Sequence, residues 1–261
     1  MKRIFSLLFL LFIFSPCFSG DISVHAAEES LDNMLNDDFL DDEDGKEKTI
    51  YDPLEPMNRF FFQVNDKLYY WVIKPVNKVY SAILPVDIRG CVGNFYTNLG
   101  TPIRALNNLL QGDFKDAGIV LSRFMINSTF GVFGFADPAY NEFNLAPRSA
   151  DFGETLGKFG VGEGVYLYWP IIGPSNVRDL AGFVVDGYAH PVPYLSTKIT
   201  TDLLYYTVKQ INVFSLKPDL YDDMKKFSLD PYIATRQAYT DYRREKVNRG
   251  LNFKLKFKSF E

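Results

Sequence analysis

Few residues in this sequence have the types and spacing that catalysis or metal binding requires. The chain has two histidines; His190 has no second ligand at metal-binding spacing, and His25 lies near the N-terminus. No G-x-S-x-G, CxxC or HExxH motif occurs. The acidic groups of Asp151 and Glu154, near Lys158, leave a carboxylate-based enzyme open as an alternative. We expect no catalytic residue, no metal and no cofactor, and we predict that the protein is not an enzyme.

Glycines recur every few residues in the middle of the chain, at Gly153, Gly157, Gly160, Gly162 and Gly164. A phosphate-binding loop would need a preceding strand, a following helix and wider glycine spacing. Here a β-like aromatic run follows instead, and Pro170 ends it. We therefore predict a flexible glycine-rich β-hairpin or loop over residues 153–173, and we regard it as a candidate moving part.

The N-terminus has the pattern of an export signal. Basic residues at positions 2 and 3 precede an apolar run over 4–14, which is too short to span a bilayer because spanning takes about 20 residues. We predict a secretory signal over residues 1–26, with cleavage near Ser19 or Gly20 as an alternative. Cys17 leaves a lipoprotein open as a further alternative, although Pro16 fits poorly before a lipidated cysteine.

Two charged segments flank the main domain. Residues 27–49 are rich in Asp and Glu and poor in large apolar groups, so we predict a disordered acidic spacer. A calcium loop is the alternative, but the spacing of the segment does not place a glycine and a terminal glutamate as an EF-hand requires. Residues 250–261 alternate apolar and basic side chains, which indicates a basic tail that forms an edge strand, contacts anionic surfaces or frays.

The domain predicted over residues 50–249 is rich in aromatic side chains. Phe, Tyr and Trp make up 16% of the whole chain, with 24 Phe and 16 Tyr. Rings with a polar edge suit a surface that meets the lipid interface, and an aromatic-rich core is the alternative. No window has the length and apolar purity of a spanning helix, so we expect helices that lie along or partly within a bilayer.

Apolar periodicity and capping signals predict a mainly helical domain. Asp52 and Pro53 open the first helix and Pro75 limits it, while Asp113 and Asp230 cap two later helices. Further helices are predicted over 101–111, 176–185 and 200–213.

Several short motifs follow one another in a distinctive order. They are YDPLEPMNRF at 51–60, NNLLQGD at 107–113, RFMINS at 123–128, GVFGFAD at 131–137, FGETLG at 152–157, GVGEG at 160–164 and DPY at 230–232. Over residues 50–245 this ordered set resembles the MlaA/VacJ family. The resemblance implies a mainly α, ring-like bundle of amphipathic helices in the inner leaflet of the bacterial outer membrane, on its periplasmic side.

The resemblance also implies a function. Proteins of this family remove phospholipid from the outer leaflet and pass it to a soluble periplasmic lipid-binding protein, usually while bound to a trimeric porin. A glycine-rich hairpin borders their channel, and residues 153–173 would correspond to it. We expect no nucleic-acid partner. A structural or surface-spreading envelope protein that binds porins without moving lipid stays open, as does a lipid-modifying enzyme.

A lipid channel would need one polar wall and one apolar wall, because the charged headgroup must cross hydrocarbon. The candidates for that lining are Arg59, Phe60, Phe61, Val64, Arg104, Arg123, Lys158 and Arg178. For each basic residue the alternative is a snorkelling interface position or an internal salt bridge.

Overall fold

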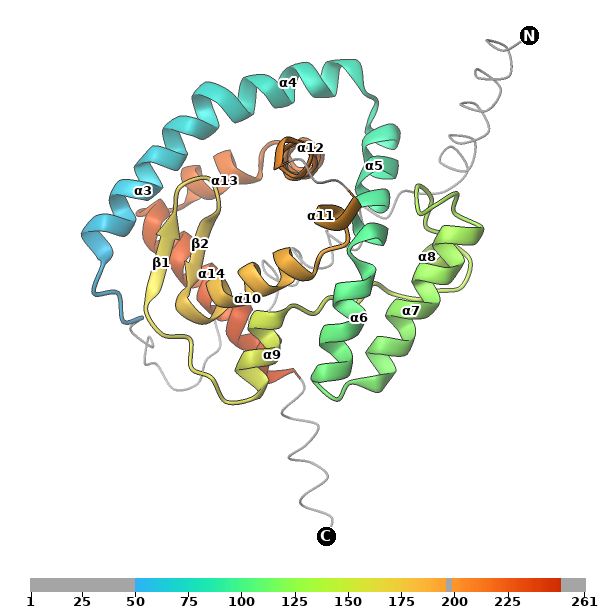
Figure 1. The fold of residues 1–261 in the computed structure, drawn as a ribbon. Coiled ribbons are helices and arrows are strands. Elements are labelled where there is room, and N and C mark those ends of the chain that lie inside the picture. Colours follow the sequence, from blue (N-terminus) through green and yellow to red (C-terminus); the bar gives the residue numbers. More distant parts are fainter. Residues whose placement is uncertain (1–49, 196–198, 250–261) are drawn as a thin grey trace. The chain divides into compact units, whose positions relative to one another are not determined.

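The computed structural model describes residues 50–195 and 199–249 (Figure 1). The predicted signal segment, Cys17, the acidic spacer and the basic tail lie outside the described residues. The described chain is mainly helical with one two-stranded sheet, which confirms the predicted class. It divides into two compact units: residues 74–149 with 189–218, and residues 50–73 with 150–188 and 219–249.

Helical residues run without a break from Glu55 to Ile83. They comprise α3 (Glu55–Leu68), a π-helical turn η2 (Tyr69–Ile73) and α4 (Lys74–Ile83). The prediction that Pro75 limits the first helix is therefore wrong. In a regular helix the Pro75 ring would clash with the carbonyl of Trp71, four residues earlier. Trp71 lies within the π turn, where the regular α-helical hydrogen-bond pattern is interrupted.

The predicted cap at Asp52 is also wrong, because α3 begins at Glu55 with no side-chain cap. The Asp52 carboxylate instead accepts hydrogen bonds from Asn58 (2.8 Å), Arg236 (3.1 Å) and the Tyr232 hydroxyl. It joins the start of the domain to a helix near the end of the chain.

The regular structure in the described part of the first unit consists of helices alone. It contains α4, α5 (Val86–Leu99), α6 (Thr101–Leu110), α7 (Phe114–Thr129), α8 (Pro138–Asn141), α11 (Val192–Leu195) and α12 (Ile199–Leu216). Helices α6 and α7 pack as a hairpin, and α12 packs against α4 and α5. As predicted, the Asp113 carboxylate caps α7 by accepting the Asp116 N–H at 3.1 Å.

The second unit combines α3 and η2 with α9 (Phe152–Lys158), β1 (Tyr166–Trp169), β2 (Gly173–Asn176), α10 (Val177–Ala189), α13 (Leu220–Phe227) and α14 (Pro231–Asn248). Its aromatic core gathers Phe62, Tyr166, Tyr168 and Tyr232. The Phe62 ring meets the rings of Tyr168 and Tyr232 edge-on, at 5.5 and 5.9 Å. Asp230 caps α14, as predicted.

The predicted hairpin is present, but it is shorter than residues 153–173. Strands β1 and β2 pair antiparallel from Tyr166 with Asn176 to Trp169 with Gly173. Gly153 and Gly157 instead lie within α9, so their assignment to the hairpin was wrong. Gly160, Gly162 and Gly164 are exposed in the connection between α9 and β1.

Close packing explains the two helical glycines. A Cβ at Gly153 would lie 2.6 Å from Asp179 Oδ1, and one at Gly157 would lie 2.6 Å from Val247 Cγ2. A Cβ at Gly182 of α10 would lie 2.3 Å from the Gly153 backbone nitrogen. Helices α9 and α10 therefore touch backbone to backbone.

Two asparagines of α3 hold the hairpin. The Asn58 side chain donates to the Tyr166 carbonyl (3.1 Å) and accepts the Tyr168 N–H (2.9 Å). Asn65 repeats the arrangement with the Trp169 carbonyl (2.8 Å) and the Ile171 N–H (2.7 Å). These side-chain amides satisfy the outer edge of β1 as a third strand would.

Candidate functional site

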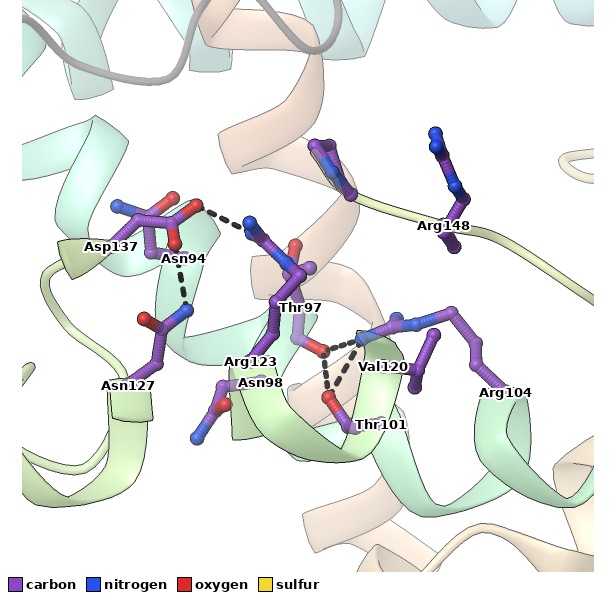
Figure 2. Close-up of a pocket in the computed structure, with 11 residues that line it drawn as sticks. Asn94, Thr97, Asn98, Thr101, Arg104, Val120, Arg123, Asn127, Asp137 and Arg148 are labelled. Atoms are coloured by element: carbon purple, nitrogen blue, oxygen red, sulfur yellow. Dashed lines mark hydrogen bonds and ion pairs between the residues drawn. The ribbon is translucent and has the colours of Figure 1, made fainter. Parts of the chain in front are cut away.

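A polar pocket opens in the first unit among α5, α6, α7 and the segment before residue 149 (Figure 2). Its cavity volume is about 40 Å³, and the pocket is partly open to solvent. Its polar lining combines three arginines and three carboxamides, namely Arg104, Arg123, Arg148, Asn94, Asn98 and Asn127. Asp137 is the pocket's acidic residue. Such a lining favours an anionic or hydrogen-bonding ligand.

Arg123 is neutralised inside this pocket. Its Nη2 donates to Asp137 Oδ2 at 2.6 Å, and its Nη1 donates to the Leu145 carbonyl. The Asn127 amide holds the second Asp137 oxygen at 2.8 Å and accepts the Ala139 N–H at 3.0 Å. Figure 2 shows these side chains converging on Asp137. This buried network fixes the turn between α7 and α8.

Arg104 has a different environment. Its guanidinium donates to the Thr97 carbonyl and to the Thr101 hydroxyl (2.8 Å) (Figure 2). In the part of the chain that the structure describes, it pairs with no carboxylate. Burial, and then the Arg123 charge, lower the pKa of Arg104 to about 10, so that it stays protonated at neutral pH. The pocket therefore carries a positive charge that no acid balances.

The other predicted basic residues lie in the second unit, and two of them form ion pairs. Arg59 lies 2.7 Å from Glu55 and 2.8 Å from Asp230, and the buried Arg178 lies 3.0 Å from Asp179. These pairs match the internal-salt-bridge alternative. Lys158 lies in the last turn of α9. Of the five predicted cations, the structure brings together Arg104 and Arg123.

A charged network surrounds Arg243 of α14 in the second unit. The guanidinium binds Asp151 (2.6 and 2.9 Å) and Asp179 (2.7 and 2.9 Å). Lys246 lies 2.9 Å from Glu154. Burial, with the Asp151 charge, raises the pKa of Glu154 to about 7. Burial opposes ionisation of Asp151 too, but the Arg243 hydrogen bonds outweigh it and lower the pKa of Asp151 to about 2.

The contacts of this network bear on the alternative that Asp151 and Glu154 form a catalytic carboxylate pair. Asp151 caps α9 by accepting the Glu154 N–H at 2.8 Å, and both carboxylates are held by cations of α14. Within residues 50–195 and 199–249, no cluster of His, Cys, Asp or Glu could hold a metal ion. The arrangement therefore joins helices through internal ion pairs.

Large apolar side chains are exposed on both units. Phe60 and Val64 of α3, predicted as lining residues, are exposed, whereas Phe61 packs against the aromatic core. Trp71 is 75% exposed. Among the described helices, none has both the length and the apolar character needed to cross a membrane. Exposed apolar surface on this scale marks contact with lipid or with another protein.

The MlaA lipoprotein family model matches residues 50–246. This chain belongs to the MlaA lipoprotein family. The match spans the motifs from which the resemblance was identified.

Similar proteins extend over most of the chain. A protein of Rickettsia conorii, described as uncharacterized, is 34% identical over 235 residues, covering 89% of this chain and 92% of the relative. The intermembrane phospholipid transport system lipoprotein MlaA of Escherichia coli K12 is 32% identical over 191 residues, covering 72% and 75%. Its Haemophilus influenzae counterpart is 31% identical over 208 residues, covering 76% and 80%.

A solved structure agrees with this family fold. It comes from work on the structural basis for maintenance of bacterial outer membrane lipid asymmetry, and it shares 31% identity with this chain at a TM-score of 0.68. The match covers 76% of this chain and all of the solved one.

The sequence prediction missed the polar frame of this pocket. Asn94, Asn98 and Asn127 lie within the quoted or neighbouring motifs but had no assigned role. Their signal was available in principle, because amides that interrupt apolar helices must find partners when buried.

Proposed function

We propose that this protein is the outer-membrane component of a phospholipid transport system. It takes phospholipid from the outer leaflet and passes it to a periplasmic lipid carrier, which keeps the two leaflets different. Membership of the MlaA lipoprotein family supports this proposal, as do relatives named as intermembrane phospholipid transport lipoproteins.

One structural observation supports the proposed transport of phospholipid. A pocket with an unbalanced arginine charge lies in a molecule whose helices expose large apolar side chains. A phospholipid has the same two parts, an anionic phosphate and apolar chains. A polar recess in such a molecule lowers the cost of taking the headgroup out of water, because burying an unpaired charge costs many kcal/mol.

The partners of this step are a trimeric porin and a soluble periplasmic lipid-binding protein. The porin would hold the protein on the periplasmic side of the outer membrane, and the carrier would receive the lipid. The exposed glycines at 160, 162 and 164, together with the hairpin, would be the moving part of the passage. Because α3 holds β1 along its length, the movement would centre on those glycines and on the hairpin tip at residues 170–172.

Reconstitution tests this function directly. The full chain is placed in vesicles with a fluorescent phospholipid, and transfer to the carrier is followed with and without porin. We expect transfer to be faster than in protein-free vesicles. A protein that binds porin but accelerates neither leaflet exchange nor handover would be a structural envelope component. Mass spectrometry of the lipids before and after would reveal any chemical modification, and altered lipid species would support an enzyme instead.

A further inference from the structure

A second cationic side chain, Lys209 of α12, lies near Arg104 in the first unit. Lys209 is partly buried, and it makes no hydrogen bond or ion pair with the described residues. Burial and the Arg104 charge lower the pKa of Lys209. Two cations held together without an acid repel each other, and a bound anion relieves that repulsion.

The packing of α12 against α5 brings these groups together. Tyr205 and Lys209 lie one turn apart on the same face of α12. The Tyr205 ring packs against Tyr96 of α5, with 4.9 Å between ring centroids. The next residue of α5, Thr97, gives its carbonyl to the Arg104 guanidinium. Arg104, Lys209 and Tyr205 therefore converge on one region of the first unit.

His190 orients the Tyr205 hydroxyl. The buried imidazole accepts the Val192 N–H at Nδ1 (3.3 Å), and its Nε2 lies 3.4 Å from the Tyr205 oxygen. Burial, and then the charges of Lys209 and Arg104, lower the pKa of His190, which favours the neutral ring. With Nδ1 as acceptor, the proton is on Nε2 and points at Tyr205. The tyrosine proton is then free to donate elsewhere.

We propose that Arg104, Lys209 and the Tyr205 hydroxyl form a binding site for a phosphate group, supplied either by a phospholipid headgroup or by free phosphate. The three groups offer a planar guanidinium fork, an ammonium and a neutral donor, which together suit phosphate oxygens. Only the lipid source of the phosphate rests on the proposed transport function.

Calorimetric titration of the full chain in detergent tests this site. The ligands are inorganic phosphate, short-chain phosphatidylglycerol and short-chain diacylglycerol, which lacks phosphate. We expect Lys209→Gln to weaken binding of the phosphate-bearing ligand about tenfold. Lys209→Arg should bind within about twofold of the wild type, as should Lys115→Gln, which removes an exposed charge from α7 of the same unit. Tyr205→Phe, expected to bind several-fold more weakly, serves as the second variant if Lys209→Gln does not fold.

The two phosphate-bearing ligands distinguish a phospholipid headgroup from free phosphate as the source of the bound phosphate. Binding of the phospholipid but not of inorganic phosphate indicates a headgroup site, and comparable binding of both indicates a general phosphate site. Equal affinities of wild type, Lys209→Gln and Tyr205→Phe would overturn the proposal, as would equally tight binding of diacylglycerol. Lipid-transfer assays on the same proteins distinguish the proposed phosphate site from the proposed transport function. Normal lipid transfer together with unchanged phosphate affinity in the variants would contradict the phosphate site alone. Phosphate binding without any lipid transfer would contradict the transport function alone.

Discussion

At the residue scale, capping was predictable only where it is local. Asp113 and Asp230 bond to amides within three residues, so sequence spacing sufficed to predict them. Asp52 has the same Asp-Pro signature as Asp230, yet its carboxylate is taken by Tyr232 and Arg236, which lie far along the chain. A long-range partner of this kind leaves no mark in local sequence, and the same holds for the convergence of Arg104 with Lys209.

Arg243 offers a direct test of the charged network in the second unit. Arg243→Ala should lower the free energy of unfolding by about 3–5 kcal/mol, because it removes the cation that Asp151 and Asp179 share and leaves Asp179 with Arg178 alone. Chemical denaturation measures this loss. Arg249→Ala, which removes an exposed arginine just after α14, should change stability by less than about 1 kcal/mol. Similar losses in the two variants would show that the network does not stabilise the fold.

Glu154 should give stability a distinct pH dependence. Its folded pKa, about 7, exceeds the ordinary carboxyl value of 4.5. Its stabilising contribution is therefore present below about 4.5 and is lost as pH rises through 7. The stability of the wild type relative to Glu154→Gln should fall over that window, by at most about 1.4 kcal/mol per pH unit. Melting curves from pH 5 to 8 measure the trend, and a constant difference would contradict it.

At the element scale, the helices of the described chain were predicted only in part. The helices over 101–111, 176–185 and 200–213 correspond to α6, α10 and α12. Helices α5 and α9 were missed, since glycines interrupt both and sequence rules treat glycine as a breaker. In α9 the glycines serve packing, which becomes evident only once α10 is seen against it.

The contact between α9 and α10 gives a paired test. Gly182→Ala places a methyl group 2.3 Å from the Gly153 nitrogen and should destabilise the protein by about 1–3 kcal/mol or more. Gly187→Ala lies on the same helix with open space around its Cβ. It should stabilise the protein by up to about 1 kcal/mol through helix propensity. Thermal melting of both variants measures the opposite signs, and equal signs would argue against the close contact.

At the scale of the whole molecule, composition pointed to lipid before any element was known. The aromatic excess of the sequence corresponds in part to exposed rings such as Phe60 and Trp71, and in part to the core around Phe62 and Tyr232. The aromatic-core reading therefore holds around Phe62 and Tyr232, and the lipid-interface reading stays a prediction for the exposed rings. Sequence alone could not divide them, because an aromatic ring suits either environment.

Intrinsic fluorescence tests the lipid contact. The chain has two tryptophans, so Trp169→Phe leaves Trp71 as the sole reporter. Because the Trp71 ring is 75% exposed, its emission should shift to shorter wavelength when phosphatidylethanolamine–phosphatidylglycerol vesicles are added. Trp71→Phe reports from Trp169, which is 37% exposed and should shift less. Unchanged Trp71 emission in vesicles would place that surface against protein or water.

The asparagine pair of α3 constrains how the length of this chain can change during evolution. Asn58 and Asn65 are seven positions apart, close to two helical turns, so both amides point to β1. Inserting or deleting a single residue between them would swing one amide by about 100° around the helix axis and detach half of the hairpin. Insertions and deletions between these asparagines should therefore be selected against, whereas the connection over residues 159–165 can absorb length changes. Homologous sequences aligned on these two asparagines should keep their spacing fixed.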